Sequence, residues 1–197
     1  MNKINKIEAV FIDRDGTIGG DDTIHYPGKF ECFPFTHSCI EQIKENNIKI
    51  FAFTNQPGIS RGMATEQDFI DELKGFGFDN VLICPHSPED GCKCRKPGIG
   101  MLLKAASKHL LNLENCIVIG DRWSDMAAAK QANCLKILVK TGSGQATLLE
   151  HQKKIKGMTI EYIAEDLKDA VQWIFQSLIN QEEDKIGGNL SSHSKES

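Results

Sequence analysis

Short runs of apolar residues alternate along this chain with longer stretches in which apolar residues recur at helical spacing. The apolar runs predict strands at 7–12, 48–53, 80–84, 116–119 and 135–139. The helical spacing between them predicts helices at 36–45, 65–75, 98–111 and 124–132. Strands that alternate with helices favour a Rossmann-like α/β fold, in which helices cover both faces of a parallel sheet. Ligands of such folds bind beyond the carboxyl ends of the strands.

The end of the chain changes in character. Residues 160–178 predict one or two closing helices, whereas residues 180–197 are mostly Gln, Glu, Asp, Lys, Gly, Ser and His. Too little apolar material remains after residue 179 to pack, so we expect a disordered tail at 180–197. One domain is then expected at 1–179. The connections between its elements leave no room for a large inserted cap domain.

Composition and charge narrow the class of protein. The 197 residues are 40% hydrophobic and 25% charged, with a formal net charge of −4, as in an ordinary soluble domain. Nothing here favours a nucleic-acid or membrane partner. The seven cysteines follow no secretory signal, so we expect reduced thiols in a cytoplasmic protein. Cys116 and Cys134 flank strand-like runs and are expected to be small core residues.

The first predicted strand ends in two carboxylates one residue apart, in the segment Asp13-Arg14-Asp15-Gly16-Thr17. A carboxylate can accept a phosphoryl group, which makes Asp13 the candidate nucleophile. Asp15 is then placed to protonate the leaving oxygen and later to activate water. Taken alone, the pattern also fits a strand that ends in a polar turn.

Two further segments carry groups that bind phosphate. The strand at 48–53 leads into Thr54 and Asn55, whose hydroxyl and amide groups can bind phosphoryl oxygens, although the segment alone is more typical of a turn. Arg95 and Lys96 precede a predicted helix, and Lys96 is our candidate for the cation that holds the phosphate between anionic groups. A basic pair in this position is otherwise usually a solvated surface feature.

The strand at 116–119 ends in Gly120-Asp121, and Asp125 follows in the next turn. We expect Asp121 to complete a Mg²⁺ site with Asp13 and the backbone carbonyl of Asp15, because Mg²⁺ prefers oxygen ligands. Asp125 has two possible roles. It can orient Lys96, or it can stabilise the helix N-terminus as an anionic residue, and we favour the helix role slightly.

Three cysteines and one histidine fall within a loop of eleven residues, as Cys84, His86, Cys92 and Cys94. Three thiolates with one imidazole match the tetrahedral ligand set of structural Zn²⁺. Such a closed set leaves no open position for chemistry, so the metal is expected to shape the loop that presents Arg95 and Lys96. Free thiols or a redox pair are the less favoured alternatives.

Together, these segments resemble the haloacid-dehalogenase-superfamily phosphatases of the small group without a cap domain. The resemblance covers about residues 7 to 142 and is strongest to the D-glycero-D-manno-heptose 1,7-bisphosphate phosphatases and the histidinol-phosphatase family. It implies a Mg²⁺-dependent phosphatase that works through an aspartyl-phosphate on Asp13. The zinc loop is a hallmark of both families, which strengthens the expectation of Zn²⁺.

The substrate is less clearly indicated. The segment 54–62, with Gly58-Ile59-Ser60-Arg61-Gly62, is similar to the heptose-bisphosphate pattern, whereas the short zinc loop resembles the histidinol-phosphatase type. Residues 19–26 depart from the heptose pattern and are expected to form one wall of the cleft. Arg61 is a candidate cation for a distal phosphate, or an exposed loop arginine. Arg122 stands where the heptose type commonly has lysine, which keeps the charge and changes its geometry.

We favour a sugar-phosphate phosphatase of the heptose-bisphosphate kind that acts on a small phosphorylated metabolite as a monomer. Histidinol phosphate is the alternative substrate. An inactive, zinc-stabilised binding module is the alternative of another class, but all the acid, cation and metal positions are present, which argues against it. A nucleic-acid 3′-phosphatase would require a basic face, which the net charge of −4 does not favour.

Overall fold

A six-stranded parallel sheet forms the centre of the molecule, with the strand order β3-β2-β1-β4-β5-β6. The computed structural model describes residues 6–21 and 23–191. The strands are β1 (Ala9–Ile12), β2 (Lys49–Asn55), β3 (Asn80–Cys84), β4 (Cys116–Gly120), β5 (Leu135–Val139) and β6 (Tyr162–Ala164). The predicted α/β fold with a parallel sheet is confirmed, and its first five strands are the predicted ones.

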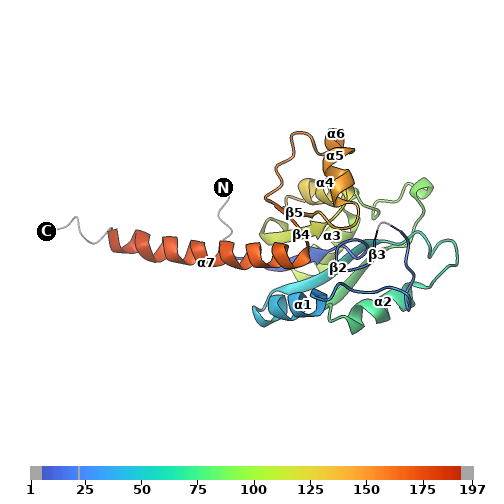
Figure 1. Ribbon diagram of the computed structural model, residues 1–197, viewed down its shortest axis with the longest axis horizontal. Helices are drawn as coiled ribbons and strands as arrows, with labels where there is room; N and C mark the ends of the chain where they lie inside the picture. Colours follow the sequence, from blue (N-terminus) through green and yellow to red (C-terminus); the bar gives the residue numbers. More distant parts are fainter. Residues whose placement is uncertain (1–5, 22, 192–197) are drawn as a thin grey trace.

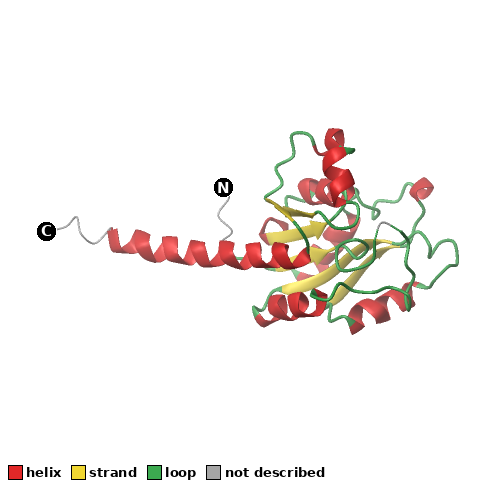
Figure 2. Ribbon diagram, viewed as in Figure 1, coloured by secondary structure: helices red, strands yellow, loops and turns green. Residues whose placement is uncertain are grey.

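Helices pack on both sides of this sheet (Figure 2). They are α1 (Thr36–Glu45), α2 (Glu66–Gly75), α3 (Gly100–His109), α4 (Trp123–Gln131), α5 (Gly144–Leu149), α6 (Gln152–Ile155) and α7 (Leu167–Ser191). The first four correspond to the predicted helices. Thr65 and Asp68 form a reciprocal cap at the start of α2, in agreement with the sequence pattern.

Each face of the sheet has its own apolar core, because successive side chains of a strand point to opposite faces. Val10 and Ile12 of β1 pack in the core that includes side chains of α1 and α7. Ala9 and Phe11 pack in the other core, with side chains of α3 and α4. The central strands β1 and β4 are buried on both faces, which explains their continuous apolar sequences.

The end of the chain differs from the prediction of closing helices alone. Tyr162–Ala164 forms the edge strand β6, which pairs with β5 before α7 begins. Helix α7 then extends beyond the sheet (Figure 1) and crosses residue 179, the predicted domain boundary, to reach Ser191. The remainder of the predicted tail, 192–197, lies outside the described residues. Among the described helices, none is long and apolar enough to cross a membrane.

The order of the strands decides where a ligand can bind. From β1 the chain proceeds outward to β2 and β3, and from β4 it proceeds to β5 and β6 on the other side. The order in which the chain adds strands therefore reverses between β1 and β4. At such a point a crevice opens beyond the carboxyl ends of the two strands. Asp13 directly follows β1 and Asp121 directly follows β4.

Candidate active site

A cleft of about 700 Å³ lies at the carboxyl ends of the strands. Its lining includes most of the predicted site residues and one wall from the segment after β1, as predicted. The residues are Asp13, Asp15, Thr23, Ile24, Thr54, Asn55, Gln56, Pro57, Pro88, Gly91, Cys92, Arg95, Lys96, Pro97, Gly98, Arg122, Trp123 and Ser124. Asp121 lies fully buried next to the cleft. The fold thus brings together groups that are up to 111 positions apart in the sequence.

Lys96 is the central cation of this site. Its ammonium lies 2.8 Å from Oδ1 of Asp13, 2.6 Å from Oδ1 of Asp125 and 2.7 Å from the carbonyl oxygen of Phe53. The residue is only 5% exposed. Burial by itself lowers the pKa of Lys96, but the two neighbouring carboxylates more than offset it, so that the pKa is raised. Lys96 is therefore a permanent ammonium, as a phosphate-binding cation requires.

Asp125 performs both of the roles considered for it. One carboxylate oxygen pairs with Lys96, and the other accepts a hydrogen bond of 2.9 Å from the backbone N–H of Arg122 at the start of α4. The favoured helix role is confirmed, and the role as partner of Lys96 is confirmed beside it. A carboxylate has two oxygens, and here each one serves a different partner.

Three buried carboxylates gather here, and the ammonium of Lys96 pairs with two of them, Asp13 and Asp125. Oxygen atoms of Asp13, Asp121 and Asp125 all lie within 4.8 Å of one another. Burial, with Asp13 and Asp125 nearby, raises the pKa of Asp121 to about 8. This crowding of negative charge is relieved when a divalent cation binds.

The donor atoms fit a hard cation such as Mg²⁺. Oδ2 of Asp121 accepts a hydrogen bond of 2.7 Å from the backbone of Ser143. Oδ1 of Asp121 is buried and has no hydrogen-bond partner among the described residues. Because Asp125 is engaged on both oxygens, Asp13 and Asp121 are the carboxylates best placed for the ion. The contribution of the Asp15 carbonyl stays a prediction.

Asp15 is held on both of its carboxylate oxygens. Oδ1 accepts from Nη1 of Arg14 at 2.5 Å, and Oδ2 accepts from Nε2 of Gln56 at 2.6 Å. Burial raises the pKa of Asp15, while the Arg14 guanidinium opposes that rise. A carboxyl with a raised pKa suits a group that must donate a proton.

The end of β2 links the acid to the predicted phosphate site. Gln56 also donates to the Thr54 hydroxyl at 2.9 Å, so one amide group joins Asp15 and Thr54. Asn55 forms two hydrogen bonds, of 3.0 and 3.2 Å, with the backbone of Lys96. Its side chain therefore fixes the loop that carries Lys96, and its predicted contact with phosphate stays a prediction.

The three arginines predicted for the site differ in position. Arg95 and Arg122 line the cleft, and the guanidinium of Arg122 lies 3.8 Å from Asp121. Arg95 donates to the carbonyl oxygen of His86 at 3.3 Å, which ties it to the cysteine-rich loop. Arg61 is exposed and is not among the residues that line the cleft.

The predicted cysteine and histidine ligands do converge. Sγ of Cys84 lies 3.6 Å from Sγ of Cys92 and 3.4 Å from Sγ of Cys94, and Nδ1 of His86 lies 3.2 Å from Sγ of Cys94. Ligand atoms around a tetrahedral Zn²⁺ are about 3.8 Å apart for bond lengths of about 2.3 Å. The cluster is compatible with zinc. Cys116 and Cys134 are buried core residues, as predicted.

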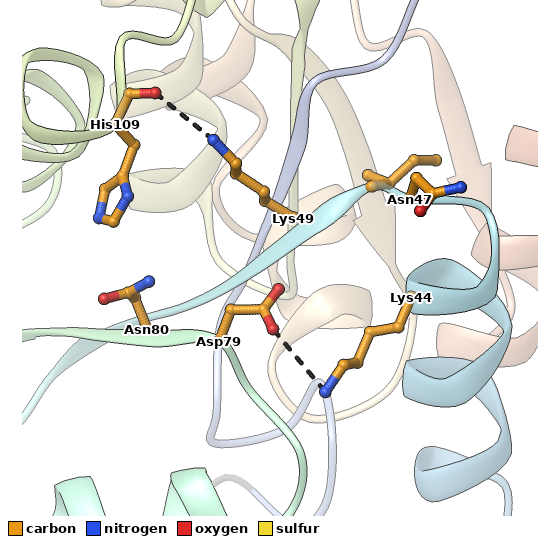
Figure 3. A pocket seen from close by; sticks show the side chains of 7 residues that line it. Lys44, Asn47, Lys49, Asp79, Asn80 and His109 are labelled. Atoms are coloured by element: carbon orange, nitrogen blue, oxygen red, sulfur yellow. Dashed lines mark hydrogen bonds and ion pairs between the residues drawn. The ribbon is translucent and has the colours of Figure 1, made fainter.

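A second cavity lies at the opposite edge of the sheet, where β2 and β3 begin (Figure 3). It measures about 330 Å³. The Lys44 ammonium lies 3.7 Å from the Asp79 carboxylate, and the Lys49 ammonium donates to the carbonyl oxygen of His109. Both cations thus have partners within the protein, in contrast to Oδ1 of Asp121, which has no hydrogen-bond partner among the described residues.

Sequence reasoning missed Arg14 and Gln56 as parts of the site. Both lie within recognised segments, directly beside Asp13 and Asn55, but a polar residue next to a motif carries no distinctive pattern of its own. Their low exposures, 0% and 3%, identify them only once the fold is known.

Comparisons with known proteins agree with this site. Residues 93–170 match the family described as HAD-hydrolase-like. The chain is 34% identical over 181 residues to a D-glycero-beta-D-manno-heptose-1,7-bisphosphate 7-phosphatase of Helicobacter pylori (strain J99), covering 85% of this chain and 97% of the relative. It is 38% identical over 164 residues to a D-glycero-alpha-D-manno-heptose-1,7-bisphosphate 7-phosphatase of Campylobacter jejuni, covering 77% of this chain and 93% of the relative.

The fold comparison points the same way. The crystal structure of D,D-heptose 1,7-bisphosphate phosphatase from B. bronchiseptica, complexed with magnesium and phosphate, matches with a TM-score of 0.74 and 28% identity. The match covers 86% of this chain and 99% of that one. The chain belongs to the D,D-heptose 1,7-bisphosphate phosphatase family of haloacid-dehalogenase-like hydrolases.

Proposed function

We propose that this protein is a Mg²⁺-dependent phosphatase that removes the 7-phosphate of D-glycero-D-manno-heptose 1,7-bisphosphate. The observation that carries the proposal is the buried group formed by Lys96 and the three carboxylates of Asp13, Asp121 and Asp125. An inactive binding module would have no use for such a group. The names of the relatives support the heptose substrate over histidinol phosphate.

The residues support a reaction in two steps. In the first step, a carboxylate oxygen of Asp13 attacks the phosphorus atom, the bond from phosphorus to the sugar oxygen breaks, and Asp15 gives its proton to that oxygen. In the second step, Asp15 takes a proton from water, whose oxygen attacks the aspartyl-phosphate. Inorganic phosphate leaves and the Asp13 carboxylate is restored.

The other side chains hold the phosphate and screen charge. Lys96 lies 2.8 Å from Asp13, so its ammonium can attract the phosphoryl group while it compensates the nucleophile. Thr54 is proposed to donate its hydroxyl to a phosphoryl oxygen. Mg²⁺ held by Asp13 and Asp121, with the predicted carbonyl of Asp15, would neutralise the charge between the carboxylate and the phosphate.

We further propose that Cys84, His86, Cys92 and Cys94 hold a structural Zn²⁺. The hydrogen bond from Arg95 to His86 connects this loop to the cleft, and Lys96 follows Arg95 directly. The metal would therefore keep the cations in place and would not take part in the reaction. A cytoplasmic monomer, with a domain at 1–179, remains our expectation.

The test is phosphate release in the presence of Mg²⁺. We expect the wild type to prefer heptose 1,7-bisphosphate over fructose 1,6-bisphosphate and histidinol phosphate. Asp13→Asn should lower kcat at least about 10³-fold, because the nucleophile is lost. Asp71→Asn, on the exposed surface of α2, is the matched control and should keep full activity.

The α and β anomers are assayed separately, because the relatives are named for both. A preference for histidinol phosphate would keep the mechanism and reject the heptose substrate. An Asp13→Asn protein with wild-type turnover would reject the mechanism itself.

A further inference from the structure

Arg14, between the two carboxylates of the first motif, has a completely buried side chain. Nη1 donates to Asp15 at 2.5 Å and to the carbonyl oxygen of His25 at 2.9 Å. Nε and Nη2 donate to one oxygen of Glu72 at 3.0 and 2.7 Å. Since Arg14 does not line the cleft, it acts on the reaction only through these partners.

Glu72 anchors the arginine from a separate element. It lies on α2, 58 positions after Arg14, and its second oxygen accepts from the backbone N–H of Gly28 at 3.1 Å. The guanidinium carbon lies 3.7 Å from the ring centre of Phe30, a contact that further restricts its plane. The arginine is thus fixed by α2 and by the segment after β1.

Stability alone does not explain why Arg14 is buried with two carboxylates. Burial of one cation with two carboxylates carries a large desolvation penalty, and apolar residues of similar volume are often as stable. The arrangement instead fixes Asp15, because the guanidinium that holds its Oδ1 is itself held in one orientation by Glu72 and Phe30. The planar fork of arginine holds several partners at once, which a lysine ammonium cannot do in the same geometry.

We propose that Arg14 is a positioning residue for Asp15: braced by Glu72, it holds Oδ1 so that Oδ2 exchanges the proton with the sugar oxygen. The same guanidinium holds the carbonyl of His25, close to the cleft residues Thr23 and Ile24. Arg14 therefore holds both Asp15 and the segment that forms one wall of the cleft. This inference rests on the acid/base role proposed above for Asp15.

The test compares kcat/KM for two substrates, a sugar phosphate that the wild type hydrolyses and p-nitrophenyl phosphate. The sugar oxygen needs a proton to leave, whereas p-nitrophenolate leaves without one. We expect Arg14→Met to lower kcat/KM about 100-fold for the sugar phosphate and threefold or less for the aryl phosphate. Arg14→Lys, which keeps the charge, should still lose about tenfold on the sugar phosphate alone.

A purely structural role would lower both kcat/KM values by the same factor, and that result would overturn the proposal. Lys136→Met is the matched control, because Lys136, near the start of β5, is also buried and paired, at 3.2 Å from Glu161, and neither residue lines the cleft. It should lower the melting temperature without changing the ratio between the substrates. If Arg14→Met does not fold, Arg14→Lys and Glu72→Gln must show the same selective loss.

Assays of the wild-type protein distinguish failure of the proposed heptose substrate from failure of the proposed role of Arg14. If it hydrolyses a sugar phosphate other than the heptose bisphosphate, the heptose assignment fails while the Arg14 test proceeds on that substrate. If it hydrolyses p-nitrophenyl phosphate but no sugar phosphate, Asp15 is not acting as the acid and the role of Arg14 is rejected as well.

Discussion

The two clusters of side chains that could hold a metal ion in this protein are built in opposite ways. Cys84, His86, Cys92 and Cys94 come from a single loop of eleven residues at the end of β3. The acidic cluster instead joins Asp13, which follows β1, to Asp121 and Asp125, which follow β4. One cluster needs only a tight loop, whereas the other exists only when β1 and β4 pair.

The clusters also differ in what surrounds them. The carboxylates are almost completely buried, Asp13 and Asp125 share the ammonium of Lys96, and the pKa of Asp121 is raised to about 8. In the cysteine and histidine cluster, Cys84 is buried and the other three residues are partly buried. A buried, crowded group of charges suits catalysis, while a closed ligand set on a surface loop suits a structural role. We therefore expect loss of the nucleophile or of the ammonium at the first cluster to abolish activity, and damage to the second cluster to weaken it.

Of the changes that compare the two clusters, Lys96→Met is expected to have the largest effect. This change removes the ammonium between Asp13 and Asp125 and leaves the carboxylates without their shared partner. We expect kcat to fall about 10³-fold and the free energy of unfolding, measured in urea without Mg²⁺, to fall by about 3 kcal/mol. Asp125→Asn, which keeps the ammonium beside Asp13, should lose only about tenfold. A Lys96→Met protein with more than a tenth of wild-type activity would show that the buried cation is dispensable.

An intermediate effect is expected from Cys92→Ala. Loss of one thiolate should abolish stoichiometric zinc binding and lower kcat about tenfold, because the loop no longer fixes Arg95 and Lys96. The measurements are metal analysis of the purified protein and phosphate release, with circular dichroism to show that the sheet persists. Cys32→Ala, outside the cluster, is the control. Full activity together with full zinc content in Cys92→Ala would refute the structural role.

The smallest effect is expected from Arg61→Ala, compared with Arg95→Ala. Arg95 lines the cleft and donates a hydrogen bond to the carbonyl oxygen of His86, whereas Arg61 is exposed and lies outside the cleft lining. We expect Arg95→Ala to raise KM for the bisphosphate about tenfold and Arg61→Ala to change it less than threefold, since an exposed charge contributes little. An increase of tenfold or more in Arg61→Ala would mean that substrate binding brings this arginine to the distal phosphate, as the sequence pattern suggested.

The sequence anticipated the elements with long or strongly apolar patterns and missed the short ones. Strands β1 and β4 are recognisable because burial on both faces demands continuous apolar residues. Strand β6 has only three residues, and its apolar side chains merge with the pattern of α7. Its pairing with β5 supplies the backbone hydrogen bonds that make it a strand, and no local pattern encodes such a partner.

Residue types and their spacing were enough to predict the chemistry proposed for this protein: Asp13 and Asp15 follow an apolar strand, and Cys84, His86, Cys92 and Cys94 have the spacing of metal ligands within one loop. Tertiary structure alone decided how these groups share their partners. In the folded protein, one carboxylate oxygen of Asp125 pairs with Lys96 and the other caps the start of α4. Arg61 lies outside the cleft lining. Folding also buries Arg14 against Asp15 and Glu72. Such contacts join residues of separate elements, so they arise only when the sheet closes and burial forces each polar group to find a partner.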